Sequence, residues 1–334
     1  MKKAQPNLLI GDIGGTNARF ALADPEAPGF SDVLTLQCAD FESAEVAIKH
    51  YLETVGAAAA DVICLAAAGP LVDKRIRITN NHWILETDAL LAEFSTDSVR
   101  LLNDFHAIAY SIPFLGADDC TTIGLPDPKP LPAQDYTVGI VGPGTGLGAV
   151  GLRKHGDLLI PIAGEASHGG FAPETKVQID VLVALRQQLD RVCSERLVSG
   201  SGLENVYWAL GEIHGEKLAN LSAAEIFVKA GENSDPHAAE AVGLFFEVLG
   251  QFAGDFALTL AAFDGVYIAG GIVKRYPDLL ASSRFRNGFE SKGRHRSIME
   301  RIPTQLIVHD QPGLLGASYC ALELFRGTEV MPTS

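Results

Sequence analysis

The pattern of apolar and polar positions predicts a mixed β-sheet with helical cover in the first third of the chain. Two short apolar runs flank a Gly-Gly-Thr-Asn corner near the start, which is typical of a β-hairpin. Further short apolar runs alternate with segments whose apolar residues recur at helical spacing. The predicted strands are 8–10, 18–22, 33–36, 61–67 and 99–102, and the predicted helices include 42–55 and 105–113.

The middle of the chain repeats the opening pattern. After the proline-rich segment 116–135, an apolar run at 136–141 meets a glycine corner at 142–148, and a second apolar run follows at 149–152. Both corners carry a threonine, Thr16 in the first and Thr145 in the second. An unrelated glycine turn is the alternative interpretation. We expect a duplicated unit whose two hairpins bind phosphate and face each other across a cleft.

The last third predicts a long buried helix and a second set of strands. Asp235 followed by Pro236 is a strong helix start, and the helix is expected to continue to about Ala262. A buried strand at 266–269 then ends at Gly270 and Gly271, and 306–308 and 314–325 predict the final strand and helix. The apolar face of the long helix is interpreted as core: Val242, Phe245, Phe246, Leu249, Phe252, Phe256 and Leu260.

The first glycine corner has features of a phosphate site. Gly14 and Gly15 have no side chains, so backbone N–H groups can approach an anion closely. Thr16 and Asn17 add side-chain donors, and Asp12 can hold Mg²⁺ directly or through water. The alternative is an ordinary hairpin with a glycine turn.

Asn103 and Asp104 stand at the carboxyl end of a predicted strand, where doubly wound folds expose reactive groups. An aspartate there can take a proton from an attacking hydroxyl in phosphoryl transfer. We expect its pKa to be unshifted, at about 3.9, so that the carboxyl is ionised at neutral pH. Simple capping of the following helix is the competing interpretation.

A second group of polar residues suits a polyhydroxylated ligand. Glu165 and His168 lie in the glycine-rich segment GEASHGGFAP, and Glu195 follows in CSERLVSG. Glu195 could instead be a surface glutamate or pair with Arg196. Glu165 and His168 could bind a metal, but no third ligand lies at a recognisable spacing. In the segment TNNHW, Asn80 is interpreted as part of a sugar-lined wall, whereas Trp83 is equally well explained as core.

Composition narrows the possible partners. At 334 residues the chain can hold two domains. Its formal charge of −15 argues against a nucleic-acid partner, although not against a nucleotide substrate. We expect no membrane span and no signal peptide, because no long apolar run or cleavage site is seen. Five scattered cysteines without a CxxC pair fit a reducing cytoplasm: Cys38, Cys64, Cys120, Cys193 and Cys320.

Eight segments, in order, together resemble the bacterial glucokinase family. They are GDIGGTNARF, TNNHW, LLNDFHAIAYSIP, GPGTGLG, GEASHGGFAP, SERLVSGSGL, FDGVYIAGGIV and VHDQPGLLGA, and they span about residues 7 to 320. The resemblance implies an α/β fold of the hexokinase and actin-like superfamily, with two ribonuclease-H-like domains closing on a central cleft. It implies a small domain of 1–115 plus 310–334 and a large domain of 116–309.

The resemblance also implies ATP-dependent phosphorylation of glucose at its 6-hydroxyl, with Asp104 as the general base. Mg²⁺, a homodimer and a role in glycolysis are expected with it. Asn103, Asp104, Glu165, His168 and Glu195 would bind glucose. The ATP-binding residues would be Gly11, Asp12, Ile13, Gly14, Gly15 and Thr16, then Gly144, Thr145 and Gly146, and finally Gly270 and Gly271.

Two departures and one absence qualify the resemblance. Ala166 and Ser167 stand where the family often has two glycines, and Gly169-Gly170 where bulkier residues are common, so a reshaped loop is expected. The cysteine-rich zinc motif of related repressors and kinases is missing, so no zinc site is expected. The alternatives are a kinase for another hexose or amino sugar, one using polyphosphate, a non-catalytic sugar sensor and an actin-like filament protein.

Overall fold

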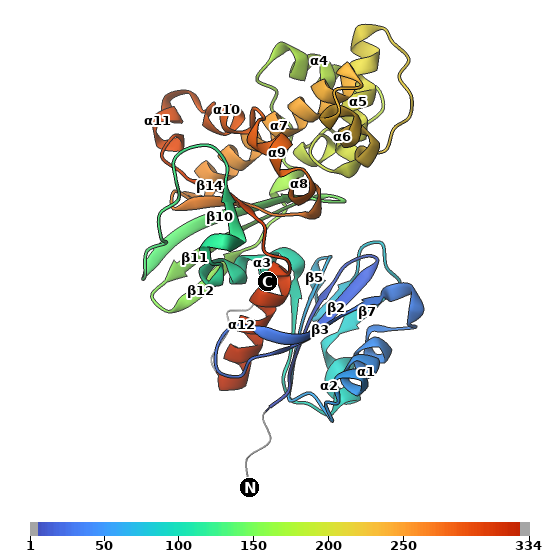
Figure 1. Cartoon of the computed structure of the whole chain (residues 1–334), viewed down its shortest axis with the longest axis vertical. Helices are drawn as coiled ribbons and strands as arrows, with labels where there is room; N and C mark the ends of the chain where they lie inside the picture. Colours follow the sequence, from blue (N-terminus) through green and yellow to red (C-terminus); the bar gives the residue numbers. More distant parts are fainter. Residues whose placement is uncertain (1–5, 328–334) are drawn as a thin grey trace. The chain divides into compact units, whose positions relative to one another are not determined.

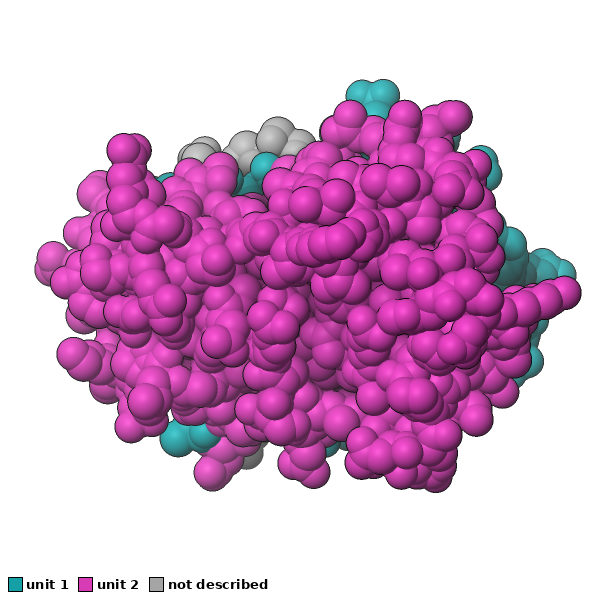
Figure 2. Space-filling model, turned by 90° about the horizontal axis from the view of Figure 1, so that it is seen from above, with its two compact units in different colours: residues 1–117, 157–163, 309–334 teal, residues 118–156, 164–308 magenta. Residues whose placement is uncertain are grey.

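A computed structural model describes residues 6–327 of the chain. By its internal contacts the chain forms two compact units, each assembled from segments that are distant in sequence. The first unit comprises Met1–Ala117, Asp157–Ala163 and His309–Ser334, and the second comprises Asp118–Gly156 and Gly164–Val308 (Figure 2). The predicted domain limits differ from this division, because they place 157–163 in the large domain.

The sheet of the first unit begins with the predicted hairpin. Strands β1 and β2 pair antiparallel around the glycine corner, β4 lies parallel to β1, and β8 lies parallel to β4. Figure 1 labels β2 and β3 of this sheet. The order across the sheet is β3-β2-β1-β4-β8. All five predicted strands are therefore confirmed. Their bounds are β1 (Leu8–Ile13), β2 (Asn17–Ala23), β3 (Phe30–Gln37), β4 (Val62–Ala67) and β8 (Val99–Asn103).

Helices of the first unit include the two predicted ones. Helix α3 packs closely on α12, where a Cβ on Gly316 would overlap the carbonyl of Ala107. A small three-stranded sheet was not predicted, because strands of two or three residues are too short to show a period of two. The helices are α1 (Ala44–Val55), α2 (Thr87–Phe94), α3 (Asp104–Ser111) and α12 (Pro312–Arg326), and the small sheet holds β5 (Leu71–Val72), β6 (Arg75–Arg77) and β7 (Ile84–Glu86).

The second large sheet repeats the topology of the first. Strand β10 pairs antiparallel with β11 around the second glycine corner and parallel with β13, which in turn lies parallel to β14. The order β12-β11-β10-β13-β14 matches β3-β2-β1-β4-β8 strand for strand, and β9 adds one more edge. The bounds are β9 (Cys120–Thr122), β10 (Asp135–Pro143), β11 (Leu147–His155), β12 (Leu158–Ile162), β13 (Gly265–Ile268) and β14 (Thr304–Ile307).

Helix α7 (Pro236–Leu260) organises the core of the second unit. Its N-cap Asp235 accepts hydrogen bonds from two backbone N–H groups of the first turn, and the predicted aromatic face is buried. By length and composition α7 could cross a membrane, but 78% of its apolar window is buried within the protein, as expected of a core helix. The other helices are α4 (Lys176–Leu185), α5 (Gly200–His214), α6 (Ala223–Gly231), α8 (Gly271–Arg275), α9 (Pro277–Ala281), α10 (Phe285–Glu290) and α11 (Arg296–Met299).

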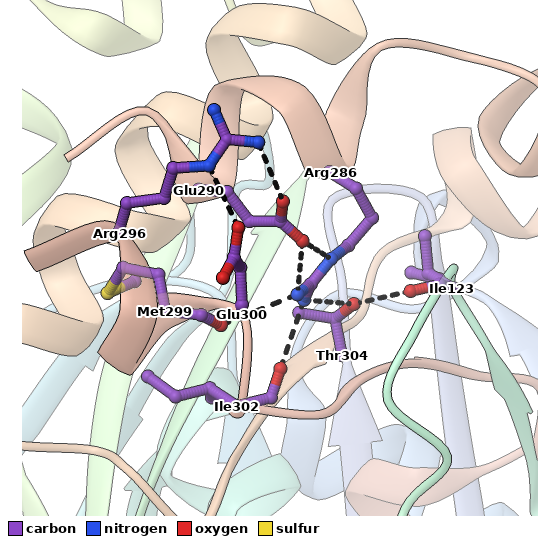
Figure 3. Close-up of polar contacts among 8 residues, drawn as sticks. All are labelled: Ile123, Arg286, Glu290, Arg296, Met299, Glu300, Ile302 and Thr304. Carbon is purple, nitrogen blue, oxygen red and sulfur yellow. Dashed lines mark hydrogen bonds and ion pairs between the residues drawn. The ribbon is translucent and has the colours of Figure 1, made fainter. Parts of the chain in front are cut away.

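A cluster around Arg286 ties α10 to the end of the sheet in the second unit (Figure 3). Its guanidinium donates to Glu290 through Nε and Nη2, at 3.0 and 2.7 Å, and to the carbonyl of Ile302 at 3.0 Å. It also donates to Thr304 Oγ1 at 3.2 Å and to the Met299 carbonyl at 3.4 Å. We call Arg286, Glu290 and Thr304 the arginine cluster. Each nitrogen of its partly buried guanidinium has a hydrogen-bond partner.

Candidate active site

In the first unit, Asn103 and Asp104 lie where β8 ends and α3 begins. Asn103 Oδ1 and Asp104 Oδ1 each accept a hydrogen bond from the backbone N–H of Phe105, both at 3.0 Å. Asn103 Nδ2 donates to the carbonyl of Gly69 at 3.1 Å, which joins β8 to the loop after β4. The capping interpretation is therefore confirmed for Asn103. Capping also holds the neighbouring Asp104 at the carboxyl end of the sheet.

The electrostatic environment of Asp104 departs from our prediction of an unshifted carboxyl. Burial, followed by the negative charge of Asp12, raises the pKa of Asp104 to about 7. These two effects outweigh the hydrogen bonds from Phe105 and Asn103, which lower that pKa. Burial also raises the pKa of Asp12, although Arg19 at 3.9 Å opposes that rise. We call Asp12 and Asp104 the carboxylate pair. A carboxyl with a pKa near 7 is a stronger base than the one predicted.

Asp12 lies against the first turn of α12. A Cβ placed on Gly313 would be 3.0 Å from Asp12 Cγ and 3.1 Å from Oδ2, so no larger side chain fits there without displacing the carboxylate. The unpaired N–H groups at a helix N-terminus carry partial positive charge, which stabilises a nearby anion. Helix α12, which lies far along the chain from Asp12, therefore contacts its carboxylate, and no local pattern in the sequence predicts this contact.

The first glycine corner is closed by a hydrogen bond from Gly14 N–H to the Asn17 carbonyl at 2.9 Å. Gly15 packs on the backbone of the 79–81 loop, 3.3 Å from Asn80 Cβ when a Cβ is added, and Asn81 Nδ2 donates to the Gly14 carbonyl at 3.2 Å. Thr16 is exposed at the tip. The structure therefore brings Asn80 to the predicted phosphate corner, and both are in the first unit.

Two side chains near this corner have structural partners. Asn17 Oδ1 accepts a hydrogen bond from Gln37 Nε2 at 2.7 Å. Trp83 is 1% exposed, and its Nε1 donates to the Phe41 carbonyl at 3.1 Å. The core interpretation of Trp83 is confirmed, and its ring does not line a sugar site.

In the second unit, Glu195 lies at the second glycine corner. Its Oε2 accepts a hydrogen bond from the backbone N–H of Leu147 at 3.0 Å and lies against Gly146, where a Cβ would collide with it. The Gly144 carbonyl accepts from Gly200 N–H at 2.9 Å, which fixes the corner to the start of α5. Glu195 is half-buried, and the described residues show no ion pair between it and Arg196. Neither alternative proposed for Glu195 holds.

Glu165 and His168 lie on a neighbouring loop of the same unit. His168 Nε2 is 3.7 Å from Glu165 Oε2, and both side chains are exposed. Backbone hydrogen bonds join this loop to the segment that carries Glu195, including Ser194 N–H to the Gly169 carbonyl at 3.3 Å. Of the two residues that depart from the family pattern, Ser167 is buried and Ala166 is partly buried. The three predicted sugar-binding residues of this unit are therefore grouped.

Sequence reasoning missed Cys193 as a neighbour of His168. Its Sγ lies 4.0 Å from His168 Nδ1, and the thiol is buried. Cys193 stands two residues before Glu195 in the segment CSERLVSG. A contact between this segment and the loop that carries His168 therefore also brings Cys193 close to His168. A lone cysteine carries no such signal by itself.

Gly270 and Gly271 follow β13 and begin α8 beside the second corner. Gly270 has φ +100°, which side chains rarely adopt, and a Cβ there would collide with the Pro143 carbonyl at the end of β10. Gly271 has open space around it. The predicted adenosine-flanking residues and the second corner, Gly144, Thr145 and Gly146, are thus adjacent. Backbone rather than side chains forms this surface.

Comparisons with known proteins agree over almost the whole chain. The family model described as Glucokinase matches residues 9–324. The glucokinase of Cronobacter sakazakii is 38% identical over 309 residues, which cover 92% of this chain and 95% of that relative. The glucokinase of Xylella fastidiosa is 39% identical over 338 residues, which cover 99% and 98%.

Solved structures give the same result. A glucokinase from an Antarctic psychrotroph superposes with a TM-score of 0.85 at 31% identity, covering 94% of this chain and 98% of that one. A ROK family glucokinase from Streptomyces griseus, in complex with glucose and AMPPNP, has a TM-score of 0.61 at 19% identity, covers 93% and 98%, and shows the shared fold. The predicted α/β fold class is confirmed, and the chain belongs to the glucokinase family.

Proposed function

We propose that Asp104 is the general base with which this protein transfers the γ-phosphoryl group of ATP to the 6-hydroxyl of glucose. Membership in the glucokinase family supports the reaction. The observation that carries the role of Asp104 is its position at the end of β8 with a pKa raised to about 7. A base of that strength is well matched to neutral pH.

In the proposed phosphoryl transfer, Asp104 takes the proton of the attacking hydroxyl. The 6-hydroxyl oxygen attacks the γ-phosphorus while its proton passes to the Asp104 carboxylate. A new O–P bond forms, the bond between the γ-phosphorus and the bridging oxygen breaks, and ADP leaves with that electron pair. Asn103 holds Asp104 in place through the helix cap, and its amide is also proposed to bind sugar hydroxyls.

The two glycine corners are proposed to hold the phosphates of ATP. The first corresponds to Gly11, Asp12, Ile13, Gly14, Gly15 and Thr16, and the second to Gly144, Thr145 and Gly146, with Gly270 and Gly271 at the adenosine. Backbone N–H groups at such corners can approach an anion closely, because no side chain intervenes. AMPPNP in the structure from Streptomyces griseus supports a nucleotide site in this fold.

The carboxylate pair fits Mg²⁺. Asp12 is half-buried beside a second carboxyl, and a hard divalent cation prefers oxygen ligands and would offset the repulsion between the two charges. Asp12 would hold the ion directly or through water. When bound, Mg²⁺ would neutralise charge on the phosphates of ATP.

Glucose specificity is proposed to come from side chains that contact the sugar hydroxyls. Asn80, Asn103 and Asp104 belong to the first unit, and Glu165, His168 and Glu195 to the second. The relatives named glucokinase favour glucose over another hexose and favour a kinase over a non-catalytic sensor. From the family resemblance we also propose a cytoplasmic homodimer serving glycolysis, with domain limits at 116 and 309.

The test is ADP release from MgATP by the purified protein over a panel of sugars and a no-sugar blank. We expect turnover with glucose well above mannose, fructose and glucosamine. Asp104→Asn should abolish most of it, whereas Asp88→Asn, an exposed aspartate paired with Lys74, should not. Equal turnover with all sugars would contradict the specificity, and an active Asp104→Asn enzyme would contradict the base.

A further inference from the structure

Two histidines and two glutamates that have no role in the candidate active site meet where α5 ends and α7 begins in the second unit. His214 is the last residue of α5, Glu216 lies two residues after it, and His237 and Glu240 lie on the first turns of α7. His237 and Glu240 are three residues apart, so they share one face of the helix. The first two residues lie at least 21 positions before the other two, so their sequence spacing gave no hint of the cluster.

The distances within the cluster suit coordination of a small cation. His214 Nε2 is 3.3 Å from Glu240 Oε2, and the ligand atoms of His214, His237 and Glu240 all lie within 4.8 Å of one another. In a tetrahedral zinc site with ligands at ~2.0–2.1 Å, neighbouring ligands are about 3.3 Å apart. One edge of such a site is therefore already formed, and the exposed side chains of His214 and Glu240 can move toward the half-buried His237 to close the rest.

The backbone that carries the cluster is held in place by both helix ends. After His214, Gly215 takes φ +70° and Glu216 N–H donates to the Gly211 carbonyl at 2.9 Å, which caps α5. On the other side, Tyr207 of α5 donates to Asp235 Oδ2, the N-cap of α7, at 2.8 Å. Glu216 Oε2 lies 3.1 Å from His237 Nε2 and orients that ring. A carboxylate on a histidine ring commonly orients metal-binding imidazoles.

We propose that His214, His237 and Glu240 bind a divalent transition-metal ion of the Zn²⁺ type, with Glu216 orienting His237. Two imidazoles and one carboxylate form a donor set that zinc uses in proteins, with a further position left to solvent. The ion joins the end of α5 to the start of α7. The proposal departs from our expectation of no zinc site, which considered only cysteine motifs and ligands close in sequence, and it does not rest on the proposed kinase activity.

The test is isothermal titration of untagged, chelator-treated full-length protein with ZnCl₂. We expect one ion per chain, with the affinity at least ~10-fold weaker in His214→Ala and in His237→Ala. Glu216→Gln should weaken it less. His155→Ala is the matched control, because His155 is an exposed histidine bonded to Asp135 outside the cluster, and it should bind as the unmodified protein does.

Two further measurements distinguish loss of the metal ligands from a folding defect and from binding at a different site. The unfolding midpoints of the metal-free variants should equal that of the unmodified protein, and only the latter should rise when Zn²⁺ is added. Absence of binding, or binding that is lost in His168→Ala but kept in His214→Ala and His237→Ala, would overturn the proposal. Hexokinase assays of the same variants report on the kinase reaction independently.

Discussion

The carboxylate pair and the arginine cluster are two partly buried groups of charged residues that differ in how the charge is compensated. Arg286 is placed so that its guanidinium meets one carboxylate, two carbonyls and one hydroxyl. Asp104 lies instead beside a second carboxyl, Asp12, and its hydrogen bonds offset only part of the cost of burial. Hydrogen bonds compensate for burial of the Arg286 charge, whereas those of Asp104 compensate for only part of the cost of burying its charge.

This difference separates a structural role from a chemical one. A buried cation with all its hydrogen bonds made stabilises one arrangement of the chain, and removing it leaves its partners unpaired. A buried acid beside a like charge costs stability, and it is retained where its altered pKa is useful. We therefore expect substitutions in the two regions to change different measured quantities.

The largest expected effect is on turnover. Asp104→Asn should lower kcat by roughly 10² to 10⁴, because the amide cannot accept the proton of the attacking hydroxyl. Steady-state kinetics with glucose and MgATP measure it. The circular dichroism spectrum should be unchanged, and a kcat within threefold of the unmodified enzyme would show that Asp104 is not the base.

The next effect is on stability. Arg286→Met should lower the free energy of unfolding by about 3–5 kcal/mol, because Glu290 would be left charged without its main partner. Urea denaturation measures it, with Arg301→Met as the exposed control. The kcat per folded molecule should change little. A loss as small as that of the control would contradict the structural role of the arginine cluster.

A third effect concerns pH. Since the pKa of Asp104 is raised to about 7, its basic form is lost as the pH falls through that value. We expect kcat/KM for glucose to fall about tenfold per pH unit below 7, so that it is roughly 100-fold lower at pH 5. A pH–rate profile measures this. A profile that stays flat down to pH 5 would assign an ordinary pKa to the base.

The smallest effect is a gain in stability. The folded-state pKa of Asp104 lies above the ordinary aspartate pKa of 3.8, so its contribution to stability is full below that value and is lost as the pH rises through about 7. The free energy of unfolding of Asp104→Asn should therefore be about 1–3 kcal/mol higher than that of the unmodified protein at pH 8, with no gain near pH 4. Denaturation at both pH values measures it, and an equal change at both would attribute the effect to packing.

Local patterns in the sequence were sufficient for most elements. The Gly14–Asn17 corner between apolar runs, the cap at Asp235 with Pro236 at the first helical position, and the spacing of Phe245, Phe252 and Phe256 each act over a few residues. The strands β5, β6 and β7 were not predicted, because they are too short to show the two-residue period of a strand. Asp104 was found because it follows a strand, but its raised pKa was not, since that depends on what surrounds it.

The sequence by itself determined the order of strands and helices, the duplicated glycine corners and, through eight segments in order, the family. These depend on neighbouring residues and on chain order. Only the tertiary structure decided that Glu195 binds the Leu147 amide, that α12 lies against Asp12, and that His214 meets His237 and Glu240. Such contacts join residues far apart in sequence, and their burial and charge exist only once the chain has folded.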